Sequence, residues 1–102
     1  MTSLDIRRIR KAAGKATAML RVLANEDRLL LLCQLTEGEK NVTELEALLD
    51  IHQPTLSQQL GVLRREGLVE TRREGKNIYY QVRDRKELTL LQTLYDLYCK
   101  KG

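Results

Sequence analysis

The stretch Gln53-Pro-Thr-Leu-Ser-Gln-Gln-Leu60, followed by Gly61-Val-Leu-Arg-Arg-Glu-Gly67, predicts a short helix with one apolar and one polar face. Pro54 suits the first turn, because its missing N–H would have no helical partner there in any case. Gly67 suits the left-handed position that ends a helix, where a Cβ would clash. The apolar face repeats at helical spacing through Leu56, Leu60 and Leu63. We therefore expect a helix over residues 54–66.

The opposite face of this helix carries uncharged hydrogen-bonding side chains and ends in arginine. The candidate DNA-contacting residues of this face are Gln53, Thr55, Ser57, Gln58, Gln59 and Arg64, and His52 in the preceding turn is a further candidate. Amides and hydroxyls can read base edges in a major groove, and arginine can bind phosphates. Alone, the pattern also fits an ordinary solvent-exposed helix face, so the rest of the chain has to support the nucleic-acid interpretation.

Length and charge agree with a nucleic-acid partner. The chain has 102 residues, the size of one domain, and a net charge of +4. Residues 1–25 carry six Lys or Arg against one acid, residues 26–50 carry two against seven, and residues 51–102 carry ten against six. The predicted reading helix thus lies in a basic half, beside an acidic middle segment. We expect residues 1–102 to form a single DNA-binding domain.

Helical patterns precede the reading helix. Apolar residues recur every three or four positions from Ile6 to Leu23, which predicts a long first helix. A second helix is expected over Glu26–Glu37, opened by Asn25 and closed by Gly38. Thr43 and Glu46 form a capping-box pattern that predicts a third helix through Leu49. A tight turn over residues 50–52 then gives a helix-turn-helix.

The pattern changes to strands after Gly67. Residues 68–72 and 77–82 are rich in β-branched and aromatic side chains, and they predict a β-hairpin with Gly75 in its turn and Arg73 and Lys76 at its tip. Asp84 opens a last helix, whose Leu88–Tyr98 segment is apolar beyond one stripe. We expect a mainly α winged helix-turn-helix that pairs as a homodimer through its first and last helices; the alternative is that both helices only cover the core.

Five segments together resemble the ArsR family of bacterial winged-helix repressors. They are Leu23-Ala-Asn-Glu-Asp-Arg-Leu-Leu-Leu-Leu32, Val42-Thr-Glu-Leu45, Gln53-Pro-Thr-Leu-Ser-Gln-Gln-Leu60, Leu63-Arg-Arg-Glu-Gly-Leu-Val69 and Tyr79-Tyr80. The resemblance implies four helices, a hairpin wing and a fifth helix in a dimer that binds an inverted-repeat operator in double-stranded DNA. His52 and Gln59 depart from the commonest family residues, which are serine and histidine at these positions.

The resemblance also bears on metals, which many members of the family sense. The thiolate type has a Cys-x-Cys pair at the third helix, where this chain has Asn41-Val-Thr-Glu-Leu45. The zinc or cobalt type uses histidine in the last helix, where this chain has none. A structural zinc site needs four N or S ligands, and the chain holds one His and two Cys. We expect no metal and no cofactor, and we assign His52 a capping or phosphate-contacting role.

The two cysteines, Cys33 and Cys99, remain as candidate sensors. From the residues alone, Cys33 fits a small buried apolar residue, and Cys99 stands at a chain end beside Lys100 and Lys101. One cysteine in the second helix and one after the fifth resembles the BigR- and SqrR-like branch of the family, which responds to sulfide and persulfide. That resemblance implies that reactive sulfur species join Cys33 to Cys99 and release the operator, although some relatives act as anti-repressors.

Other functions stay open or are excluded at this point. The chain shows no Ser/His/Asp set and no phosphate-cradling glycine loop, so we do not expect an enzyme. It has no apolar run of membrane-spanning length and no signal-peptide core, so we expect a cytoplasmic protein. The alternatives to a thiol-regulated repressor are a regulator with inert cysteines and another effector, and a winged-helix adaptor that binds proteins.

Overall fold

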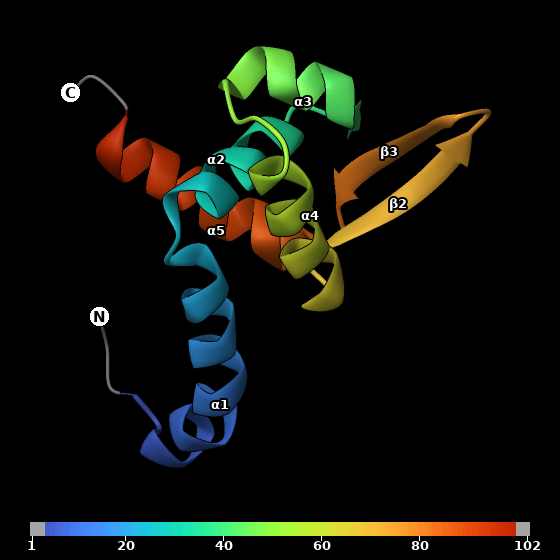
Figure 1. Ribbon diagram of the computed structural model, residues 1–102. Helices are drawn as coiled ribbons and strands as arrows, with labels where there is room; N and C mark the ends of the chain where they lie inside the picture. The colour runs from blue at the N-terminus through green and yellow to red at the C-terminus, as the bar shows by residue number, and fades with distance from the viewer. Residues whose placement is uncertain (1–3, 100–102) are drawn as a thin grey trace.

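The order of helices and strands is that of a winged helix-turn-helix. A computed structural model describes residues 4–99 (Figure 1). Its elements are α1 (Ile6–Leu23), α2 (Glu26–Leu35), β1 (Lys40–Asn41), α3 (Val42–Leu49), α4 (Thr55–Arg65), β2 (Val69–Glu74), β3 (Asn77–Val82) and α5 (Arg85–Tyr98). The fold class predicted from the sequence, mainly helical with a hairpin, is confirmed. In Figure 1, α1 and the β2–β3 hairpin project from a central group of helices.

The core lies between α2, α3, α4 and α5. Side chains with almost no solvent exposure come from three of these helices, and they are Leu31, Leu32, Leu45, Leu56, Leu60 and Leu63. Leu91 of α5 is 2% exposed and closes the core from the other side. Helix α2 lies at the centre of this core, and of its run of four leucines only Leu30 is exposed. The three leucines of α4 face inward, so its polar face points outward.

Helix α2 ends at Leu35, two residues earlier than the sequence predicts. The hydroxyl of Thr36 donates to the carbonyl of Cys33 at 2.6 Å. The N–H groups of Thr36, Glu37 and Gly38 each donate to the carbonyl three residues earlier, at 3.2 Å. The last turn is therefore tighter than an α-helix, and the i→i+3 bonds satisfy carbonyls that would otherwise lack partners.

The capping box of α3 lies two residues before the predicted one. The side chain of Asn41 accepts from the N–H of Glu44, and the Glu44 carboxylate accepts from the N–H of Asn41, both at 2.9 Å. Thr43 and Glu46, which the sequence favoured, are inside the helix. Asn41 takes this role because it belongs to β1, a strand that the sequence did not predict, and strand pairing holds its backbone extended.

The sheet has three antiparallel strands in the order β1-β3-β2. The hairpin is confirmed, with β2 beginning at Val69 and extending to Glu74, two residues beyond the predicted end. Gly75 has φ of +61° in its turn, a conformation that suits glycine. Thr71 and Arg72 of β2 pair with Tyr80 and Tyr79 of β3. Among residues 4–99, no further strand flanks the wing beyond the two residues of β1.

Candidate nucleic-acid interface and thiol pair

Hydrogen bonds define both the beginning and the end of helix α4. The Gln53 side-chain oxygen accepts from the N–H of Ser57 at 3.0 Å, so Gln53 caps the first turn. At the other end, Gly67 has φ of +79°, and the N–H of Leu68 donates to the carbonyl of Leu63 at 2.9 Å. This six-to-one bond, with Gly67 left-handed, is a Schellman ending. The helix length predicted from Pro54 and Gly67 is therefore confirmed within a residue at each end.

The polar face of α4 divides into free and engaged side chains. Ser57, Gln58 and Arg64 are exposed, whereas Thr55 and Gln59 are half-buried. Gln59 accepts through Oε1 from the Arg28 guanidinium at 3.0 Å, so only its amide nitrogen stays free of that contact. Gln58 is therefore the better placed of the two glutamines for base contacts.

Arg28 joins three helices, a role that the sequence analysis missed. From α2, its Nε donates to the Val22 carbonyl at 2.7 Å, and Nη2 donates to the Arg21 carbonyl at 3.3 Å. Its Nη1 meets Gln59 of α4. A cation at the negative end of α1 is also favoured by the helix dipole. The available signal was a long cation in the strongly acidic middle segment, without an acid at i+4.

His52 lies between two carboxylates instead of capping α4. Its Nε2 is 2.7 Å from Asp50 Oδ1, and its Nδ1 is 3.5 Å from Glu46 Oε2. Within residues 4–99 the side chain that caps α4 is Gln53, so the capping role expected for His52 is wrong. The ring remains exposed beside the turn that leads into α4, and its phosphate contact stays a prediction.

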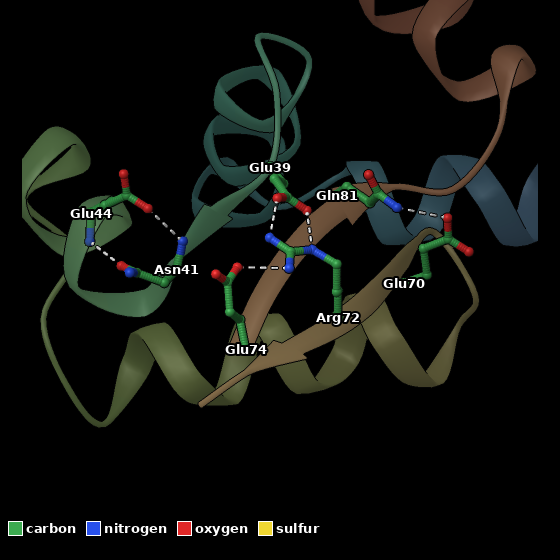
Figure 2. Close-up of polar contacts among 7 residues, drawn as sticks. All are labelled: Glu39, Asn41, Glu44, Glu70, Arg72, Glu74 and Gln81. Carbon is green, nitrogen blue, oxygen red and sulfur yellow. Dashed lines mark hydrogen bonds and ion pairs between the residues drawn. The ribbon is translucent and has the colours of Figure 1, made fainter. Parts of the chain in front are cut away.

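The wing presents free positive charge near its tip. Arg73 and Lys76 are exposed, and no carboxylate of the described segment lies within ion-pair distance of either. Arg72, their neighbour, is instead held by Glu39 and Glu74 (Figure 2). Successive strand residues point to opposite faces, which separates the paired Arg72 from the free Arg73.

Cys33 and Cys99 are 66 positions apart (99 minus 33), and the fold brings Cys33 of α2 into one cavity wall with Tyr95 of α5, one helical turn before Cys99. Burial raises the pKa of the Cys33 thiol, and the nearby Cys99 raises it further. Cys33 also forms part of the wall of a cavity of about 550 Å³ between α2 and α5. Cys99 is exposed at the end of α5, and both thiols are free. Cys99 is therefore the more accessible nucleophile of the two.

Two features are absent from residues 4–99. Between residues 4 and 99, no three or more His, Cys, Asp or Glu side chains are grouped so that they could hold a metal ion. No helix in that span combines the length and apolar character needed to cross a membrane.

The fold, the outward polar helix and the basic wing define a winged helix-turn-helix of the DNA-binding kind. Residues 25–71 match the model of the arsR family, described as a bacterial regulatory protein. The chain is 52% identical over 89 residues to the biofilm growth-associated repressor of Agrobacterium fabrum, covering 87% of this chain and 76% of that protein. The chain belongs to the ArsR family, and it is a DNA-binding transcriptional regulator, not an enzyme.

Two other similarities support this assignment. The chain is 37% identical to the transcriptional activator HlyU of Vibrio cholerae, over 95% of this chain and 90% of that protein. The crystal structure of the transcriptional repressor BigR from Xylella fastidiosa superposes with a TM-score of 0.90 at 44% identity. That match covers 96% of this chain and all of the other. The recognition of an ArsR regulator of the BigR-like branch from sequence is confirmed.

Proposed function

We propose that residues 1–102 form a single domain that works as a homodimeric repressor on an inverted-repeat operator and releases it when Cys33 and Cys99 react with a persulfide. The observation that supports the sensing part is that the half-buried Cys33 shares a cavity wall with Tyr95 of α5, one helical turn before the exposed Cys99. The DNA-binding part rests on the exposed polar face of α4. The name of the Agrobacterium fabrum relative supports repression, whereas that of HlyU supports activation, so the sign of regulation needs its own test.

The dimer accounts for apolar surface that a single subunit leaves uncovered. On α1, Ile6, Ile9 and Leu20 are 58%, 43% and 55% exposed. On α5, Leu97 and Tyr98 are 70% and 82% exposed. Two helices with such faces bury them when subunits associate, and a twofold dimer also matches a palindromic site. Sedimentation equilibrium would return the mass of two chains; a monomer at micromolar concentration would contradict the pairing.

The reading step follows from the position of α4. In the proposed dimer, the two copies enter successive major grooves about 34–36 Å apart, which corresponds to half-sites one helical turn apart. Ser57, Gln58 and Thr55 face the base edges, while Arg64, Arg73 and Lys76 bind phosphates. In vitro selection from a random duplex library should recover an inverted repeat with this spacing. Binding that shows no sequence preference would leave the protein-binding adaptor as the better account.

The sensing chemistry requires only the two thiols and a persulfide of the form R–S–SH. The Cys99 thiolate attacks the terminal sulfur, which forms Cys99–S–SH and releases R–SH. The Cys33 thiolate then attacks the Cys99 sulfur, which forms the Cys33–Cys99 disulfide and releases hydrogen sulfide. The sulfane sulfur accepts the two electrons, so no other oxidant is needed. If the Cα atoms are more than about 7 Å apart, a longer polysulfide bridge fits better.

The link between the thiols would act on the spacing of the reading helices. Cys33 belongs to α2, which is fastened to α4 through Arg28 and Gln59. Cys99 directly follows α5, the helix proposed for the dimer interface. A covalent tie fixes one relative to the other, and DNA with a fixed repeat penalises the altered geometry. In the reducing cytoplasm both thiols are free until a persulfide arrives.

Intact-mass spectrometry tests this sensing step. Persulfide treatment should join Cys33 to Cys99 within one subunit, and peptide mapping should locate the bridge. Serine at either cysteine should abolish the bridge and leave operator binding by the reduced protein intact. Absence of any crosslink in the parent protein would favour a regulator whose cysteines are inert and whose effector is different.

A further inference from the structure

The middle of the wing contains an arginine, Arg72, whose three guanidinium nitrogens each donate to a carboxylate of the protein. Arg72 donates from Nε to Glu39 Oε2 at 3.1 Å and from Nη2 to Glu39 Oε1 at 2.5 Å. Its Nη1 donates to Glu74 Oε2 at 2.8 Å. The guanidinium carbon also lies 4.9 Å from the centre of the Tyr79 ring. Figure 2 shows the bidentate contact with Glu39 and the single contact with Glu74.

The two ends of this contact come from different parts of the fold. Arg72 belongs to β2, whereas Glu39 directly precedes β1, on the far side of β3 in the strand order. Arg72 stands opposite Tyr79 of β3, and Tyr79 stands opposite Asn41 of β1. The side chain therefore crosses the central strand over the tyrosine ring and joins both outer strands. The contact spans 33 positions of sequence.

Glu39 belongs to the segment that leads into the helix-turn-helix. The next strand, β1, supplies Asn41, and Asn41 forms the capping box with Glu44 of α3 (Figure 2). Between β1 and the wing there are only two residue pairs, Lys40 with Tyr80 and Asn41 with Tyr79. Such a short pairing constrains the direction of a long hairpin weakly, so an added side-chain tie has a large effect on where its tip lies.

The ionisation of Glu39 is consistent with an ion pair to Arg72 at neutral pH. The hydrogen bond from Arg72 lowers the pKa of Glu39, so its carboxylate stays charged over the whole physiological range. Isolated exposed ion pairs contribute little, but planar bidentate geometry and several partners make a stronger case. The same bidentate geometry explains why lysine would not replace this arginine, because an ammonium group cannot hold both carboxylate oxygens in a plane.

We propose that Arg72 and Glu39 form a positioning pair that fixes the wing relative to α3 and α4, so that Arg73 and Lys76 reach the operator backbone while Arg72 itself does not contact DNA. The inference rests on the proposed placement of the wing on DNA. Glu39, although it is an acid in a DNA-binding protein, therefore favours operator binding. Without the Glu39 carboxylate, Arg72 would no longer hold the hairpin in place.

The informative variant is Glu39→Gln, because positioning and simple charge predict opposite signs. Removing an acid lessens repulsion from phosphate, so charge alone predicts tighter binding. Loss of the positioning pair predicts weaker binding, up to about fivefold per wing and about 25-fold for a dimer with two wings. Arg72→Lys keeps the positive charge but loses the bidentate contact with Glu39, so it should weaken operator binding about as much as Glu39→Gln does.

Glu70→Gln is the matched control. It makes the same charge change as Glu39→Gln, but Glu70 lies on β2 of the hairpin, accepts only from Gln81 of β3 at 3.0 Å and does not connect the wing to β1 (Figure 2). Its operator affinity should equal or exceed that of the parent. Hydroxyl-radical footprinting supplies a readout that general destabilisation would not give. In Glu39→Gln, protection at the flanks should fade while protection under α4 persists.

Two results would overturn the inference, and they are distinguishable. If Glu39→Gln matched Glu70→Gln in both affinity and flank protection, the pair would not position the wing, although the wing contacts would stand. If the double variant Arg73→Ala, Lys76→Ala kept the parent's footprint and salt dependence, the wing would not meet DNA at all. In that second case the proposed wing contacts and the positioning pair would both be wrong.

Discussion

The two free cations of the wing allow a quantitative prediction about salt. Arg73 and Lys76 are exposed and unpaired within the described residues, so a dimer offers four such charges to phosphates. Each phosphate contact contributes about −0.9 to the slope of log affinity against log salt. Replacing both residues by alanine should therefore make the slope shallower by about 3.6 units. Between about 50 and 200 mM salt, the affinity gap between parent and variant should narrow by about 150-fold.

Fluorescence anisotropy with a labelled operator duplex, repeated at several salt concentrations, measures this slope directly. A scrambled duplex should lose affinity in the same proportion, because phosphate contacts carry no sequence information. The double variant Arg10→Ala, Lys11→Ala removes the same charge from exposed positions of α1 and serves as the control. An unchanged slope in the wing variant, or an equal change in the α1 control, would refute the reasoning.

Three further predictions concern reading, packing and ionisation. Gln58→Ala should relax base preference at one position of each half-site, at a cost of about 1–3 kcal/mol, when competing sequences are compared by anisotropy; unchanged preference would exclude Gln58 as a reader. Leu60, 1% exposed, lies under the reading helix, so Leu60→Ala should lower the free energy of urea unfolding by about 2–5 kcal/mol, and a loss below 1 kcal/mol would contradict its central place in the core. Burial, and then Asp84, raise the pKa of Glu87, whose Oε2 lacks a hydrogen-bond partner. Because the folded-state pKa lies above the unfolded one, ionisation disfavours folding at neutral pH. Glu87→Gln should therefore raise the thermal midpoint at pH 7, with the gain lost below the ordinary range of a glutamate pKa; a gain independent of pH would point to another cause.

The parts of the fold that sequence predicts are those with local signals. Pro54, Gly67 and Gly75 each mark a change of direction through their own backbone preferences, and all three lie where the sequence places them. The leucine spacing of α4 likewise fixes which face is buried. These features depend on neighbours within a few positions, so a pattern can reveal them.

The parts that sequence misses depend on distant partners. Strand β1 has two residues and no periodicity, and it exists because β3 pairs with it from about 40 positions further along the chain (Lys40 with Tyr80). That pairing also decides between two capping patterns that overlap in sequence, in favour of Asn41 and Glu44. The contact between Arg28 and Gln59 spans 31 positions, and the signal for it, a cation without an acid at i+4, does not identify Gln59 as the partner. Because this contact cannot be identified from the sequence, the sequence predicts Gln58 and Gln59 to be equally available for base contacts.

The measurement that tests the central claim most directly is operator affinity before and after persulfide treatment, with intact mass recorded on the same samples. The parent protein should bind tightly when reduced, form a bridge between Cys33 and Cys99 within one subunit, and lose operator affinity by about 5- to 150-fold, the usual range of coupling between sites. Cys33→Ser and Cys99→Ser should bind as the reduced parent does and keep that affinity after treatment. Release of DNA by the Cys99→Ser protein, or a bridge that forms only between subunits, would contradict the account.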